Sequence, residues 1–157
     1  MSFLKNLFKK EKLDIAVLID GPNILRKAFS VDLADIKNEI VKYGNIRVAK
    51  VYLDQFASDK LIEAMRNQGF ETIITTGDVD VTMAIEAMEY VLDPDIDTIA
   101  LVTRDTDYLP VLVKARARGK KAIIVATDVA FSAALKNTAD HVIIIKGKGI
   151  VEHIKNP

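Results

Sequence analysis

Six short apolar runs alternate along the chain with segments in which apolar residues recur at helical spacing. The runs are rich in Val, Ile and Leu, which is typical of strands buried on both faces of a parallel sheet. They cover residues 13–19, 46–53, 70–75, 98–103, 121–126 and 141–145. The helical segments cover residues 33–41, 61–65, 81–91, 108–118 and 130–137. The pattern therefore predicts strands and helices in alternation.

Such alternation favours an α/β fold with three layers, in which helices cover both faces of a mainly parallel sheet of roughly six strands. Gly44, Gly69 and Gly119 each stand just past a helical segment, so we expect each to end its helix in the left-handed conformation. Residues 1–12 form a short basic segment, either an amphipathic helix or disordered in isolation, residues 13–146 the domain, and residues 147–157 a C-terminal tail.

Length and composition narrow the class of protein. A chain of 157 residues predicts one domain. The 22 Lys and Arg balance 22 Asp and Glu, which argues against an obligate duplex-DNA binder. The absence of Cys and the presence of only two His exclude disulfide scaffolds and thiolate or His-rich metal centres. No apolar run reaches the roughly 18–20 residues of a membrane span, and the first residues lack a secretory signal pattern, so we expect a cytoplasmic protein.

Acidic residues gather in the turns after three of the predicted strands. These turns read Asp20-Gly21-Pro22-Asn23, Gly77-Asp78-Val79-Asp80 and Arg104-Asp105-Thr106-Asp107. The carboxyl ends of parallel strands meet at one edge of a sheet, so we expect the three turns to lie together. Each Asp alone could cap a helix. Together, the carboxylates repel one another unless protons or a cation neutralise them.

A hard cation is the simplest neutralising partner for this set. Carboxylate oxygens without Cys favour Mg²⁺ or Mn²⁺ over zinc, and Mg²⁺ leaves coordination positions for water and phosphate. Two ions could activate a water and stabilise the leaving oxygen of a phosphodiester, whereas a single ion could still polarise the phosphate. The acidic turns therefore predict metal-assisted phosphate chemistry, with the number of ions left open.

Three segments together resemble the NYN domain family, which belongs to the wider PIN-like nuclease fold. They are Asp20 to Ile24, the helix that Asp80 opens, and Val102 to Pro110. The resemblance extends from Leu13 to about Ile145. It implies a metal-dependent ribonuclease in which Asp20, Asp80 and Asp105 bind the metal and act in catalysis, with Asp107 as a further acidic member. Asn23 would hold the first turn or touch substrate, and Asp78 and Thr103 are additional candidates.

The chain departs from the family pattern at two places. Gly77-Asp78 stands where many members have a Lys-Gly pair, so a basic residue that could face phosphate is absent. Arg104 stands within a turn that often reads Ser-Gly-Asp-Ser-Asp, and it could restore a phosphate contact. All the acidic residues survive both departures.

Basic residues suggest how RNA would bind. Arg26, Lys27 and Arg104 lie in or just after the acidic turns, where they either contact RNA phosphates or form an ordinary solvated surface. The denser basic run at residues 116–121 follows a helix that leads away from the acidic edge, so we expect it at the opposite edge. The expected partner is RNA, single-stranded, and a homo-oligomer is compatible with the sequence.

Two other functions remain as alternatives. One is an RNA-binding module of the same fold that cleaves slowly or not at all. The other is a phosphotransfer protein similar to haloacid-dehalogenase-like phosphatases, built on Asp105-Thr106-Asp107. That family carries its Asp-x-Asp motif after an early strand, whereas here the motif follows the fourth.

Overall fold

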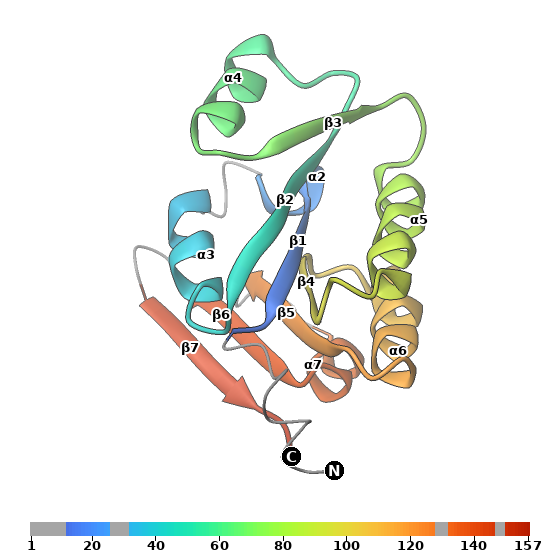
Figure 1. Ribbon diagram of the computed structural model, residues 1–157. Coiled ribbons are helices and arrows are strands. Elements are labelled where there is room, and N and C mark those ends of the chain that lie inside the picture. Colours follow the sequence, from blue (N-terminus) through green and yellow to red (C-terminus); the bar gives the residue numbers. More distant parts are fainter. Residues whose placement is uncertain (1–11, 26–31, 128–131, 147–149) are drawn as a thin grey trace.

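The computed structural model describes residues 12–25, 32–127, 132–146 and 150–157, and within them seven strands form one sheet (Figure 1). The strands are β1 (Asp14–Asp20), β2 (Asn45–Asp54), β3 (Glu71–Thr75), β4 (Thr98–Val102), β5 (Lys121–Thr127), β6 (His141–Lys146) and β7 (Ile150–Lys155). The first six strands pair in parallel, and β7 runs antiparallel to β6. The predicted α/β class with a mainly parallel sheet is therefore confirmed.

The strand order is β3-β2-β1-β4-β5-β6-β7. From β1 the chain builds outward through β2 and β3, and then returns to place β4 on the other side of β1. The order of the strands thus reverses between β1 and β4. In open α/β sheets, ligands bind outside the carboxyl ends of the strands at such a reversal.

Helices pack against both faces of the sheet (Figure 1). Three of them, α2 (Gly21–Ile24), α3 (Leu33–Ile40) and α4 (Asp59–Asn67), contribute to one hydrophobic cluster. Three further helices of the described residues, α5 (Val79–Leu92), α6 (Leu109–Ala117) and α7 (Ala133–Thr138), contribute to a second cluster. Along β1, Ala16 and Leu18 belong to the second cluster and Val17 and Ile19 to the first. Alternate side chains of a strand point to opposite faces, which is why β1 reads as one continuous apolar run.

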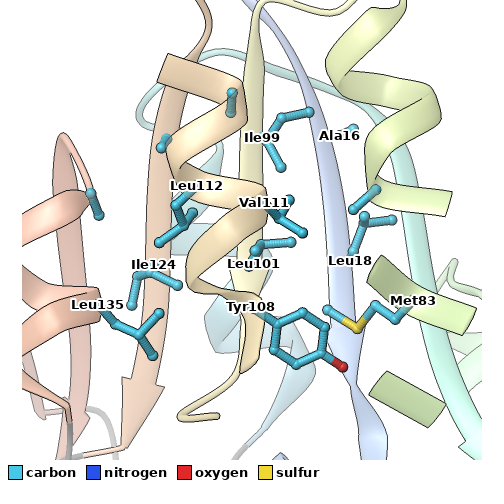
Figure 2. Packing of buried hydrophobic residues seen from close by; sticks show 14 of the residues in the cluster. Ala16, Leu18, Met83, Ile99, Leu101, Tyr108, Val111, Leu112, Ile124 and Leu135 are labelled. Carbon is cyan, nitrogen blue, oxygen red and sulfur yellow. The ribbon is translucent and has the colours of Figure 1, made fainter. Parts of the chain in front are cut away.

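Tyr108 closes the second cluster toward the carboxyl edge of the sheet. Tyr108 is the last residue of the short 3-10 turn η2 (Thr106–Tyr108), which leads directly into α6. Figure 2 shows its ring beside Met83 and below Leu101 and Val111, with the hydroxyl directed toward β1. Tyr108 is fully buried, so a polar atom inside this cluster requires a partner, which the strand end supplies.

The C-terminal residues differ from their predicted role as a tail. Residues 150–155 form β7, which pairs along its length with β6. His153 on β7 contacts Glu39 Oε2 through Nε2 at 2.7 Å and Tyr43 Oη through Nδ1 at 2.8 Å. The prediction missed this strand because an edge strand with Glu and His lacks a continuous apolar run. The predicted N-terminal segment lies outside the described residues, apart from Lys12.

None of the helices in the described parts of the chain has both the length and the apolar composition that a membrane span requires.

Two of the three predicted helix-ending glycines have the expected backbone. Gly69 and Gly119 have φ angles of 85° and 75°, which confirms the left-handed conformation. For Gly44 the prediction is wrong, because its φ is not positive. A Cβ at Gly44 would instead lie 2.3 Å from the carbonyl oxygen of Leu13. Glycine is required there by a close approach of two backbone segments, one of which leads into β1.

Gly44→Ala is therefore expected to lower the free energy of unfolding by about 1–3 kcal/mol, as overpacking does elsewhere. Gly77→Ala is the matched control, since a Cβ at Gly77 meets nothing within 4 Å, and its stability should stay equal or rise by up to about 1 kcal/mol. Urea unfolding of the two variants measures both effects. Equal stability of the two variants would contradict the account of Gly44.

Candidate metal centre

Carboxylates from four strand ends line one cleft at the reversal of strand order. Asp20 ends β1 and Asp54 ends β2, while Asp80 lies in the first turn of α5 after β3 and Asp105 follows β4. The lining residues are Asp20, Pro22, Asn23, Asp54, Gly77, Asp78, Val79, Asp80 and Asp105. The structure thus brings together the three predicted turns, and adds one acidic residue.

Asp54 is the acidic residue that the sequence analysis missed. The apolar run before it predicts a strand that ends at Leu53, whereas β2 continues to Asp54. The signal was present, because β1 and β2 both end with an aliphatic residue followed by Asp. Asp54 Oδ1 accepts a hydrogen bond from the backbone N–H of Phe56 at 2.9 Å, which fixes the turn after β2.

Asp80, Asp105 and Asp107 form the closest group of carboxylates in the described part of the chain. One carboxylate oxygen from each lies within 4.8 Å of those of the other two. Asp105 caps the turn η2, since its Oδ1 accepts from the backbone N–H of Asp107 at 2.9 Å. Asp80 and Asp105 are half-buried and Asp107 is exposed. The group therefore faces solvent on one side while α5 and η2 fix its backbone.

Asp20 is more deeply buried than this group, with a relative exposure of 5%. Its Oδ2 accepts hydrogen bonds from the hydroxyl of Tyr108 at 3.2 Å and of Thr103 at 3.4 Å. Its Oδ1 accepts from the backbone N–H of Asn23 at 3.4 Å. The Tyr108 hydroxyl thus has a partner, and the end of β1 is joined to the residues that follow β4.

Burial raises the pKa of the Asp20 carboxyl above its ordinary value, because the charged form loses contact with water. The hydrogen bonds from Asn23, Tyr108 and Thr103 act in the opposite direction, since they favour the carboxylate. The negative charge of Asp105 raises the pKa further. Asp20 and Asp105 thus repel each other electrostatically across the cleft, which is the effect that a bound cation would relieve.

Asn23 and Thr103 connect the first acidic turn to the third. Asn23 Oδ1 accepts from the backbone N–H of Arg104 at 2.9 Å. Thr103 is fully buried, and its hydroxyl oxygen also accepts from the backbone N–H of Asp105 at 3.1 Å. Both side chains therefore hold the first and third acidic turns together. Asn23 also lines the cleft.

The predicted basic residues fall into two groups. Arg26 and Lys27 lie outside the described residues, and Arg104 belongs to the turn that follows β4. Arg116 contacts the carbonyl oxygen of Thr138 at 2.9 Å and the Asp140 carboxylate at 3.7 Å. Thr138 and Asp140 immediately precede β6, so Arg116 lies at the amino edge of the sheet. The expected placement of residue 116 away from the acidic cleft is confirmed.

The donor set of the cleft suits a hard divalent cation. Its close group supplies three carboxylates, and the chain has no Cys to compete as a soft ligand. Mg²⁺ commonly takes a few carboxylates and fills its remaining positions with water and phosphate oxygens. Asp80, Asp105 and Asp107 are thus compatible in ligand type with a hard divalent cation.

Comparisons with known proteins place the chain beside one domain family and two proteins without an assigned function. A family model described as NYN domain matches residues 14–146. A protein of Methanocaldococcus jannaschii, described as uncharacterized, is 56% identical over 137 residues, which are 87% of this chain and 57% of that protein. The chain therefore spans little more than half the length of this relative.

A crystal structure of a protein of unknown function from Vibrio parahaemolyticus has a similar fold. It aligns with a TM-score of 0.75 and 23% sequence identity, over 89% of this chain and 96% of that one. The similarity concerns the fold alone.

If Asp80, Asp105 and Asp107 form a cation site, the variant Asp80→Asn should lose the stabilisation by metal without losing stability in the absence of metal. Asp80→Asn keeps the size of the side chain and removes one repelling charge, so in EDTA it should melt at the wild-type temperature or higher. Mn²⁺ should raise the melting temperature of the wild type by mass action, and the increase should be largely lost in Asp80→Asn. Thermal melting with EDTA and with Mn²⁺ measures both.

Asp59→Asn is the control, because Asp59 lies in the first turn of α4 and is exposed. Its melting temperature should rise with Mn²⁺ as the wild type's does. A lower melting temperature of Asp80→Asn in EDTA, with the Mn²⁺ response intact, would show that Asp80 is structural.

Tyr108→Phe should destabilise the protein, because Asp20 would lose a hydroxyl donor inside the protein. The expected cost is about 1–3 kcal/mol of unfolding free energy. In the Asp20→Asn background the same change should cost less, since a neutral amide accepts a weaker hydrogen bond. Urea unfolding of the four proteins gives the coupling energy, and equal costs in both backgrounds would contradict the assigned contact.

Proposed function

The chain belongs to the NYN domain family, a family of nuclease type, and from this premise we propose that it is a metal-dependent ribonuclease. Its substrate would be single-stranded RNA, and the reaction would be hydrolysis of a phosphodiester bond. The carboxylate group of Asp80, Asp105 and Asp107 carries the proposal, because Asp80 and Asp105 line the cleft where the strand order reverses and Asp107 lies beside them.

Asp80, Asp105 and Asp107 would hold Mg²⁺ or Mn²⁺ as direct ligands. We include Asp20 in the catalytic set, since it lines the same cleft and carries the turn that resembles the family's first motif. When bound, the cation supplies an activated water and stabilises charge on the phosphate oxygens. The hydrogen bonds of Tyr108 and Thr103 to Asp20 Oδ2 would hold its carboxylate in a fixed orientation.

Asn23 and Thr103 would act as positioning residues in this mechanism. They join the turns that carry Asp20 and Asp105 through hydrogen bonds on both sides. A site held by such contacts keeps its ligands in place before the metal arrives, which lowers the cost of binding. Asp54 and Asp78 line the same cleft and would add to its negative charge.

RNA would approach the cleft through its phosphates. The acidic side chains alone repel a polyanion, so binding near them depends on the cation. Arg104 lies in the third acidic turn and, with Arg26 and Lys27, is our candidate for phosphate contacts. Such contacts provide affinity without sequence specificity, which agrees with a cleft that is open to solvent.

An RNA-binding module without cleavage is the second candidate. The observation in its favour is Gly77-Asp78, which stands where many family members have a Lys-Gly pair, so the basic residue is absent and Asp78 adds a carboxylate to the cleft lining beside it. A carboxylate at this position adds repulsion toward the phosphate instead of attraction. Both candidates bind RNA, and only the ribonuclease gives metal-dependent products.

Cleavage of labelled single-stranded RNA tests the proposal directly. Products should form with Mn²⁺ or Mg²⁺, disappear with EDTA, and fall by orders of magnitude in Asp80→Asn. The double variant of Arg116→Gln and Arg118→Gln is the control, and it should cleave at the wild-type rate because Arg116 lies at the amino edge. Arg104→Gln should bind RNA more weakly than that control. Cleavage that survives in EDTA or in Asp80→Asn would overturn the assignment.

A further inference from the structure

We propose that a second pocket, which adjoins the acidic cleft and has Phe56 at its rim, binds an unpaired nucleobase of the RNA strand. This inference rests on the proposed function, since it assigns a subsite to the same substrate. The pocket is lined mainly by apolar side chains, among them Leu25, Leu53, Phe56 and Leu61.

The pocket and the acidic cleft share a wall. Pro22 and Asp54 line both of them. Pro22 belongs to the turn after β1, and Asp54 is the last residue of β2, which lies directly beside β1. A nucleotide with its phosphate in the acidic cleft would therefore have this pocket immediately next to it.

Phe56 is presented in an unusual way for an aromatic residue. The residue is 84% exposed, the highest value among the large hydrophobic residues that stand exposed in the described structure. Its backbone N–H donates to Asp54 Oδ1, and the N–H of Ala57 donates to the carbonyl oxygen of Asp54 at 3.2 Å. These bonds hold the turn that places the ring beside the shared wall. An exposed ring at this point gains from covering its face with another flat, apolar group.

The charges of the pocket favour a base over a phosphate. Asp54 is the charged residue in its lining, and a carboxylate repels phosphate. A nucleobase is uncharged, with two apolar faces and a polar edge, so it fits between aliphatic side chains and an aromatic ring. Stacking of this kind tolerates any base, because every base has a π-face. The base must be unpaired to enter, which makes the pocket selective for single-stranded RNA.

Binding of a short labelled RNA to Phe56 variants tests this role. Fluorescence anisotropy with Ca²⁺ present, which takes oxygen ligands as Mg²⁺ does, should show that Phe56→Ala weakens binding by about tenfold or more. Phe56→Trp should bind as the wild type or more tightly. Val113→Ala is the control, since Val113 is an exposed apolar residue of α6, 51% exposed, and its affinity should not change.

RNAs that each lack a single base identify the contact itself. At one position, removal of the base should weaken binding to the wild type by about as much as Phe56→Ala does. At that position the two changes should not add, because both remove the same stacking contact. Wild-type affinity of Phe56→Ala, or losses that add at every position, would overturn the assignment of the pocket.

A parallel cleavage assay with Mn²⁺ separates this inference from the proposed function. If the wild type cleaves and Phe56→Ala binds RNA equally well, the base pocket is wrong and the ribonuclease assignment stands. If the wild type binds RNA through Phe56 without cleaving it, the base pocket stands and the ribonuclease assignment is wrong. Absence of RNA binding by the wild type overturns both.

Discussion

The buried carboxylate of Asp20 is the contact on which the geometry of the cleft depends. It ends β1, an interior strand of the sheet, and accepts hydrogen bonds from Asn23, Thr103 and Tyr108. Two of these donors lie after β4, on the far side of the strand reversal. A buried carboxylate is costly without such donors, so the same bonds that stabilise Asp20 also fix the turn that carries Asp105 and Asp107.

Carboxylates that repel one another therefore lie together at the carboxyl edge of the sheet. The two hydrophobic clusters on its faces hold the strands in parallel, and parallel pairing brings all six carboxyl ends to that edge. The carboxylates of Asp80 and Asp105 repel each other because they carry like charges, and this repulsion lowers the stability of the fold. Asp80 in the first turn of α5 and Asp105 at the N-cap of η2 partly offset the repulsion, because the amino ends of helices favour negative charge. A divalent cation would offset the remainder.

The sequence predicted the six parallel strands well because each is buried on both faces. Such strands read as continuous apolar runs. No observed end of these strands differs from the predicted one by more than one residue. The edge strand β7 was missed because its stability comes from pairing with β6, which leaves no apolar signature in a segment that contains Glu152 and His153. Gly44 was misinterpreted for a similar reason, since its close contact with Leu13 is a long-range feature of the fold.

The sequence indicated which acidic residues line the cleft. It did not indicate which of them is buried and which belong to the close group of carboxylates. Position after a parallel strand was enough to bring Asp20, Asp80 and Asp105 into one lining. It could not show that Asp20 is buried among hydroxyl donors while Asp107 joins the close group, because this depends on the 3-10 turn at residues 106–108. Asp54 required the exact end of β2, which apolar patterning does not define.

The most direct test of the central claim is a crystal structure of the protein with Mn²⁺. The account predicts an anomalous peak in the acidic cleft, with oxygens of Asp80, Asp105 and Asp107 at bonding distance and water in the remaining positions. Tyr108 and Thr103 should still donate to Asp20. A cleft without a peak at saturating Mn²⁺, or a peak bound by residues outside it, would contradict the account.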